Sequence, residues 1–292
     1  MELMRFDDVS DFLAVAERFL VAREAEHNFL LGLTGVLAAN PSSASGPAYL
    51  AVVSEGAAIH LAAIRLAPYG VMLSEALDPA AIGPLMADLA QYDRGLRGVS
   101  GPAAPAREFA RLWTEATGQR AQLEIAERIY HLSSVRQPDR AVPGAWRLAE
   151  EPDLGLLSDW LVAFYHEAAP RSPQPVDPDE FAGRWVGPNA RAGRAMYLWT
   201  AADRVVSMVG AGSPTPNGIR IGPVYTPPDE RGRGYASALT AAASQNQLDR
   251  GRSWCFLLTD LANPTSNHIY QAIGYEPVSD VDQYLFVDRG SG

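Results

Sequence analysis

The chain has 292 residues, of which 47% are hydrophobic and 20% charged, a composition typical of globular proteins and long enough for two domains. A net charge of −10 argues against nonspecific binding to nucleic acid and mildly favours cationic small substrates through electrostatic steering. With a single cysteine, Cys255, and five scattered histidines, we expect neither an internal disulfide nor a metal site.

The sequence also predicts a cytoplasmic protein that does not cross a membrane. No window approaches about 18 consecutive apolar residues. The first eight residues lack the basic region and apolar core of a signal peptide. Cys255 falls in an apolar, strand-like stretch, so we expect an inert buried thiol and not a nucleophile.

The first half of the chain alternates helical and strand-like patterns. Phe12, Val15 and Phe19 recur at helical spacing, and short turns containing glycine or proline separate the strands that follow, which suggests an antiparallel meander. The predicted elements are a helix over 10–37, strands over 49–54, 58–66 and 70–76, a helix over 79–92, a strand over 96–100, a helix over 105–118 and one or two strands over 122–135.

The second half repeats this order after a polar, proline-containing linker at 136–144. The predicted elements are a strand over 146–149, a helix over 154–168, a proline-rich loop over 170–178, a helix over 179–185 and strands over 195–200, 205–211 and 219–226. The repeated order indicates a duplicated architecture of class α+β. We therefore predict two domains, residues 1–140 and 145–290.

A basic glycine loop, Arg231-Gly232-Arg233-Gly234, follows the strand over 219–226 and precedes a helix that runs to Asp249. The first turn of a helix has backbone N–H groups without partners and carries the positive end of the helix dipole, so glycines there favour a phosphate site. The alternative is a surface turn with solvated arginines. The corresponding loop of the first half, 77–84, has neither a glycine pair nor an arginine, which assigns phosphate binding to the second half alone.

Two motifs in this region resemble the GNAT superfamily of N-acyltransferases. Arg231, Gly234 and Ala236 match its coenzyme A loop, and Asn263, seven residues before Tyr270, precedes a Gly-Tyr pair as in its second motif. The resemblance implies two GNAT-like domains, each with a central mixed, mostly antiparallel sheet flanked by helices. It also implies a splayed strand pair in the C-terminal domain and a degenerate N-terminal domain.

The resemblance also implies a role for each matching residue. Backbone amides of the loop would hold the coenzyme A pyrophosphate, the strand before it would pair with the pantetheine arm, Asn263 would contact the pantetheine or end the fifth strand, and Tyr270 would be the general acid. The residues so assigned are Val224, Tyr225, Thr226, Arg231, Gly232, Arg233, Gly234, Tyr235, Ala236, Asn263 and Tyr270. As alternatives, Asn263 is a helix N-cap and Tyr270 a core aromatic.

In many members of the family, a glutamate on the strand before the loop is the general base. This sequence departs from that pattern, because residues 219–226 contain no carboxylate. Glu167 is the best substitute, at the edge of the apolar face of its helix. Its alternative is an ion pair with Arg171, one helical turn on. The acids Asp177, Asp179 and Glu180 form either an acceptor lid or a solvated rim, and Asp260 is either an acceptor contact or a helix cap.

These residues predict an N-acetyltransferase that moves an acetyl group from acetyl-CoA, without a metal, to a primary amine of a small cationic molecule by direct attack in a ternary complex. We expect a monomer or homodimer with no nucleic-acid or membrane partner. The alternative is a catalytically weak acyl-CoA-binding or regulatory protein. An ATP-binding loop ranks lower, because the Gly-Lys-Ser/Thr ending of such loops is missing from the sequence.

Overall fold

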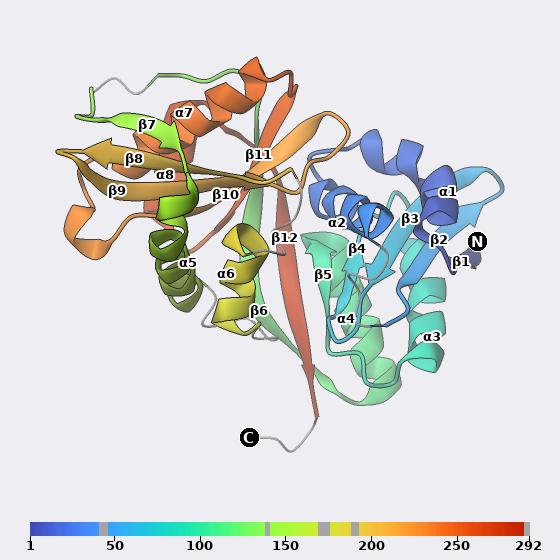
Figure 1. Ribbon diagram of the computed structural model, residues 1–292. Helices are drawn as coiled ribbons and strands as arrows, with labels where there is room; N and C mark the ends of the chain where they lie inside the picture. The colour runs from blue at the N-terminus through green and yellow to red at the C-terminus, as the bar shows by residue number, and fades with distance from the viewer. Residues whose placement is uncertain (41–45, 138–140, 169–175, 188–192, 289–292) are drawn as a thin grey trace. The chain divides into compact units, whose positions relative to one another are not determined.

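A computed structural model describes residues 1–40, 46–137, 141–168, 176–187 and 193–288 (Figure 1). The chain forms two compact units. Unit 1 comprises Met1–Ile129, Asp260–Ala262 and Val278–Gly292, and unit 2 comprises Tyr130–Thr259 and Asn263–Pro277. No described helix has the length and apolar character needed to span a bilayer.

Unit 1 is a sheet with helices on both faces. Its strands follow the order β1-β2-β3-β4-β5-β12-β6, in which β4 and β5 are parallel and the other registered pairs are antiparallel. Its elements are β1 (Glu2–Phe6), α1 (Val9–Val21), α2 (Asn28–Ala39), β2 (Tyr49–Glu55), β3 (Ala58–Arg65), β4 (Val71–Leu73), η2 (Pro79–Ala81), α3 (Ile82–Tyr92), β5 (Gly98–Pro102), α4 (Ala103–Thr117), most of β6 (Arg120–Leu132) and the end of β12 (Glu276–Val287).

Strand β2 shows why this sheet is covered on both sides. Its side chains alternate between two apolar clusters, as the period of a strand requires. Tyr49, Ala51 and Val53 pack with α3 and α4, whereas Leu50 and Val52 pack with α1 and α2. Residues 49–53 of β2 are therefore all hydrophobic, because neither face of the strand meets water.

Two details of unit 1 differ from the sequence prediction. The single helix predicted over 10–37 is two helices, α1 and α2, because the fully buried His27 bonds to separate segments. Its Nδ1 lies 2.9 Å from the Leu20 carbonyl oxygen, and its Nε2 accepts from the Glu75 amide at 3.1 Å. Burial lowers the pKa of His27, which favours the neutral ring that this pairing uses. The second difference is that β1 and β12 escaped prediction.

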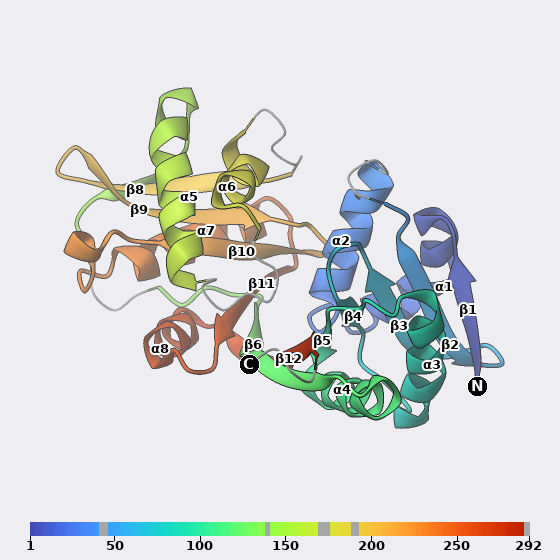
Figure 2. The ribbon, with the colours of Figure 1, turned by 90° about the horizontal axis from the view of Figure 1, so that it is seen from below.

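Unit 2 has the same layered construction, with strand order β6-β11-β10-β9-β8-β7. Helices α7 and α8 cover one face of its sheet and α5 and α6 cover the other, where Figure 2 shows α5 crossing the strands. Its elements are β7 (Ala145–Leu148), η3 (Glu151–Asp153), α5 (Leu154–Ala168), α6 (Pro178–Val186), β8 (Ala195–Ala201), β9 (Arg204–Gly212), β10 (Gly218–Tyr225), η4 (Pro228–Glu230), α7 (Tyr235–Asp249), β11 (Trp254–Asp260) and α8 (Pro264–Ile273). The predicted α+β class is confirmed.

Strand β12 brings the end of the chain into unit 1. Its residues Val281–Leu285 pair antiparallel with Gly98–Pro102 of β5. Phe286 is buried, and its ring stacks on Trp113 at a centroid distance of 5.2 Å. Residues 278–287 thus complete the sheet and core of the N-terminal unit, whereas the sequence prediction divided the chain at 140–145.

Replacing Phe286 tests this shared strand. Phe286→Ala should lower the free energy of unfolding by roughly 3 to 5 kcal/mol, because it leaves a cavity beside Trp113. Leu123→Ala, at a side chain 50% exposed on β6, should change it by no more than about 0.5 kcal/mol. Urea unfolding measures both variants, and an effect of Phe286→Ala as small as that of the control would contradict the assignment.

Candidate functional site

The site begins where strand β10 parts from strand β11. Parallel pairing between them covers only Gly218, Ile219 and Arg220, whereas pairing of β10 with β9 continues to Tyr225. The register with β9 shifts between Ile221 and Val224. The last residues of β10 are therefore hydrogen-bonded on one side only within the described sheet. This is the splayed strand pair expected from the sequence, and it leaves backbone groups available to an extended ligand.

The end of β10 is held by its neighbours. Tyr225 is 8% exposed, and its ring lies 5.9 Å from that of Trp160 on α5. The Ser207 hydroxyl on β9 donates to the Tyr225 carbonyl at 3.1 Å and lies 2.8 Å from the Thr226 hydroxyl. Burial, and then the negative charge of Glu167, raise the pKa of Tyr225, so this phenol is not a base.

The glycine loop leads from this strand into helix α7. Gly232 and Gly234 have φ of +76° and +86°, which favours glycine at both positions, and Gly234 is the N-cap of α7. No side chain caps the helix, whose first backbone bond runs from the Ala238 amide to the Gly234 carbonyl at 3.0 Å. The amides of the first turn are therefore free to bind an anion. A Cβ at Gly232 would meet nothing within 4 Å, so the approach is open.

The corresponding region of unit 1 is built differently. The Asp78 carboxylate accepts from the Ala80 amide at 2.8 Å and caps η2, which leads into α3. A carboxylate of the chain thus lies where an anion would otherwise bind. The assignment of phosphate binding to one half stays a prediction that this contrast favours.

Both loop arginines have carboxylate partners. Arg231 Nη2 donates to Glu167 Oε1 at 2.9 Å and to Oε2 at 2.6 Å, and Arg231 Nε donates to the Thr226 carbonyl at 2.8 Å. Both side chains of this pair are about half exposed, at 47% and 48%. Arg233 Nη1 pairs with Glu230 at 2.8 Å. The end of α5 is thus tied to the loop, and the loop presents backbone amides more than unpaired guanidinium groups.

Asn263 and Tyr270 lie on the short helix that follows β11. Asn263 is the N-cap of α8, since its Oδ1 accepts from the Ser266 amide at 3.1 Å. Tyr270 is partly buried, and its ring lies 6.1 Å from Tyr275 in an edge-on arrangement. Burial raises the pKa of Tyr270 to about 12, against the opposing effect of a hydrogen bond with Ser266. The phenol is therefore protonated at neutral pH.

Comparisons with known proteins bear on the fold. Residues 202–287 match the family model described as FR47-like protein, and no curated protein sequence matches the chain. A Drosophila protein structure is 12% identical over 98% of each chain, with a TM-score of 0.69. A GCN5-related N-acetyltransferase from Sphaerobacter thermophilus is 16% identical over 99% of this chain and 96% of its own, with a TM-score of 0.61.

A third structure decides the architecture. A tandem GNAT protein from the clavulanic acid biosynthesis pathway is 14% identical over 100% of this chain and 99% of its own, with a TM-score of 0.56. The chain has the tandem GNAT fold. The resemblance that the two sequence motifs indicated is thereby confirmed at the level of the fold.

On this GNAT fold, most acids proposed for the acceptor side have structural partners. Asp177 caps α6 by accepting from the amides of Asp179 and Glu180, at 2.9 and 3.0 Å. Glu180 pairs with Arg184 at 2.7 Å, and Asp260 accepts from the Ala262 amide at 2.7 Å. Arg171, the predicted partner of Glu167, lies outside the described residues, and the structure pairs Glu167 with Arg231 instead.

The remaining predicted residues are placed as follows. Cys255 is fully buried, as predicted, its Sγ lies 3.6 Å from the Ser244 carbonyl oxygen, and burial raises its pKa to about 12, which disfavours the reactive thiolate. Tyr235 is buried and Ala236 half-buried at the start of α7. Ser207 and Trp160, which hold the end of β10, were missed, because contacts between strands and helices far apart in sequence leave no local motif.

A double-mutant cycle tests the link between α5 and the loop. Arg231→Ala and Glu167→Ala should show a coupling free energy of roughly 0.2 to 1 kcal/mol in chemical unfolding, as expected of a half-exposed pair, and the coupling should shrink with added salt. Arg233→Ala combined with Glu167→Ala is the control, because no hydrogen bond or ion pair joins these two described residues, and its effects should add. Additive effects in the first cycle would mean that the pair contributes nothing to stability.

Proposed function

We propose that unit 2 is an N-acetyltransferase that transfers the acetyl group of acetyl-CoA to a primary amine of a small molecule. One observation carries this proposal: the pairing of β10 with β11 ends beside the uncapped, glycine-flanked start of α7. A strand edge without a second partner, followed by free helical amides, suits a ligand with an extended amide-bearing arm and a diphosphate.

The residues that would hold acetyl-CoA are those of the loop and the strand before it. Amides from Gly232 to Ala236 would bind the pyrophosphate, and the backbone of Val224–Thr226 would pair with the pantetheine arm. When bound, acetyl-CoA supplies an acetyl thioester. Because Arg231 and Arg233 already pair with carboxylates, the backbone amides provide most of the anion recognition.

Tyr270 is proposed as the general acid that protonates the leaving sulfur. A donor must hold its proton at working pH, and burial keeps this phenol protonated well past neutrality. The shift from the usual tyrosine pKa of about 10 also makes Tyr270 a weaker acid, so its contribution would depend on its position beside the leaving sulfur. Its helix is fixed at one end by the Asn263 cap and at the other by Gly274, so the phenol is carried on a short, well-anchored element.

Glu167 is proposed as the group that accepts a proton from the attacking amine, directly or through water. Its two oxygens both accept from Arg231, which fixes the carboxylate at the loop and leaves further lone pairs on each oxygen. The preference for a cationic acceptor rests on the net charge of −10, since several acceptor-side acids have other partners.

A matched pair at Gly232 tests the anion site. Asp and Asn both tolerate the left-handed backbone, and the side chain would enter open space. Gly232→Asp should therefore weaken acetyl-CoA binding by about tenfold or more relative to Gly232→Asn, because it places a negative charge beside the pyrophosphate. Calorimetry measures both affinities.

The control for added charge is Gly56→Asp in unit 1, at a turn with φ of +58° and open space around the Cβ. It should leave the affinity for acetyl-CoA unchanged. Equal affinities for the Asp and Asn variants of Gly232 would remove the loop as the diphosphate site.

Tyr270→Phe tests the general acid. Turnover should fall by about 100-fold, the lower end of the range for general acid catalysis, with the affinity for acetyl-CoA retained. Tyr275→Phe is the neighbouring control: its hydroxyl bonds Ser244 at 2.8 Å in the core, so it should lower stability and spare turnover. Steady-state thiol release with calorimetry decides the question, and full activity of Tyr270→Phe from neutral to alkaline pH would exclude this role.

The second candidate is an acyl-CoA-binding protein with little catalysis. The engagement of both Glu167 oxygens by Arg231 favours it, because the candidate base already has a partner. Thiol release over a panel of small amines separates the two functions, since turnover with any amine supports the enzyme. Acetyl-CoA binding without turnover across the panel supports the second candidate.

A further inference from the structure

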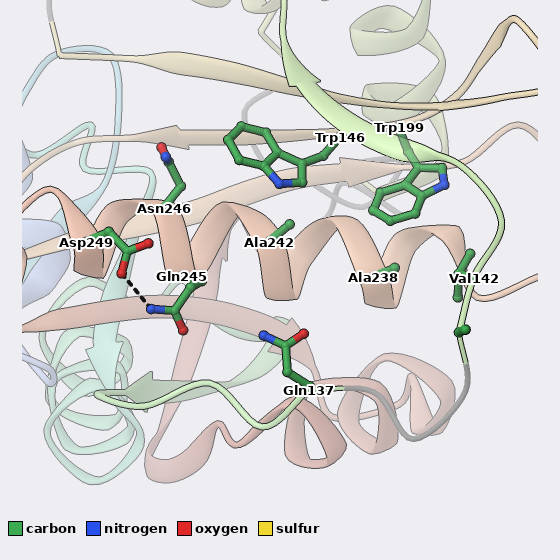
Figure 3. Close-up of a pocket in the computed structure, with 10 residues that line it drawn as sticks. Gln137, Val142, Trp146, Trp199, Ala238, Ala242, Gln245, Asn246 and Asp249 are labelled. Atoms are coloured by element: carbon green, nitrogen blue, oxygen red, sulfur yellow. Dashed lines mark hydrogen bonds between the residues drawn. The ribbon is translucent and has the colours of Figure 1, made fainter.

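Unit 2 contains a cavity along α7. Its volume is about 370 Å³, within the size range of small-molecule sites. Its walls come from β7, β8, α7 and the residues Gln137, Ala141 and Val142. Figure 3 shows Trp146 and Trp199 next to each other along one side of α7. None of its lining residues has a part in the proposed reaction.

The cavity follows from the register of two strands and the composition of one helix. Trp146 of β7 lies directly opposite Trp199 of β8, so both indoles project from the same face of the sheet. The facing positions of α7 are Ala238 and Ala242, one helical turn apart. Large side chains on the strands meet small ones on the helix, and the space between them stays open.

The two indoles are not equivalent. Trp199 is 8% exposed, and its Nε1 donates to the Pro143 carbonyl at 2.9 Å, so it is a fixed wall of the cavity. Trp146 is 40% exposed on an edge strand, and within the described chain its Nε1 has no acceptor. Its ring lies 5.8 Å from that of Tyr197, which leaves part of the indole surface for a ligand.

The other end of the cavity is polar and rich in hydrogen-bond acceptors. Gln245 Nε2 donates to Asp249 Oδ1 at 2.8 Å, so Gln245 Oε1 and Asp249 Oδ2 are left without partners among the described residues. Asn246 Oδ1 accepts from the Tyr197 hydroxyl at 2.8 Å. Among the described residues, Arg250 is a nearby cation, whose charge acts on that same hydroxyl. The unpaired groups are a carboxylate oxygen and an amide oxygen, and the exposed Asp249 can accept from water or from the N–H donors of a ligand.

We propose that this cavity binds a small organic cation with a planar aromatic body, such as an aryl amidine or an aromatic amine. The ring would stack on the exposed indole of Trp146, where aromatic and cation–π attraction act together. The cationic N–H groups would donate to Asp249 and Gln245. No residue of the coenzyme loop lines this site, and the proposal does not depend on the proposed reaction.

Benzamidine is the probe, and calorimetry of the whole chain is the measurement. The wild type should bind benzamidine, and benzamide, its neutral counterpart, should bind at least about tenfold more weakly. Asp249→Asn should weaken benzamidine binding by about tenfold, since it removes a charged acceptor and keeps the shape. Trp146→Ala should weaken it by a similar factor through loss of the stacking surface.

Two variants control for nonspecific effects. Leu148→Ala removes another exposed side chain of β7 outside the cavity, and Asp203→Asn removes a charge at the turn between β8 and β9. Both should bind benzamidine as the wild type does. Where Trp146→Ala fails to fold by circular dichroism, Asp249→Asn alone decides. Absent binding, equal binding of benzamide, or unchanged binding by Asp249→Asn would each overturn the proposal.

Discussion

The arrangement of unit 2 depends on the place where two parallel strands stop pairing. Backbone N–H and C=O groups in a sheet are normally paired, and leaving them without partners costs free energy unless water or a ligand satisfies them. Beyond Arg220, the described β10 keeps β9 as its partner and loses β11. Ser207 stabilises the end of β10 through the Tyr225 carbonyl, so the strand keeps its course without a second neighbour. The site exists because a strand is held from one side.

Local sequence patterns predicted most helices and strands. They did not predict the features that depend on contacts between segments far apart in the sequence. Helix α5 was predicted with its observed bounds, because its apolar spacing is regular. The break between α1 and α2 was not predicted, since the His27 side chain that holds it bonds to the Glu75 amide, 48 positions away. Strand β12 escaped for a related reason: its half-buried pattern has meaning only beside β5, which lies far earlier in the chain.

The candidate site shows the same division. The glycines of the loop and the Asn263 cap could be read from sequence, because each acts on a backbone within a few residues. The partner of Glu167 could not: Arg171 is its neighbour one turn away in sequence, and Arg231, 64 positions away, is its partner in the fold. A carboxylate near an arginine in sequence is a weak guide to pairing, because a loop returning in space competes for it.

Helix α7 borders both the glycine loop at its start and the cavity along its length, and it has small residues at both places. At its start, the φ of +86° excludes most side chains at Gly234, and a Cβ there would also lie 3.1 Å from Val142 Cγ2. Val142 also lines the cavity beside Trp146 and Trp199, so the same residue borders the cavity and the start of the helix. Glycine at 234 leaves the helical amides open, and alanine at 238 and 242 leaves the cavity open. Small side chains along one helix thus leave both its first-turn amides and the neighbouring cavity uncovered.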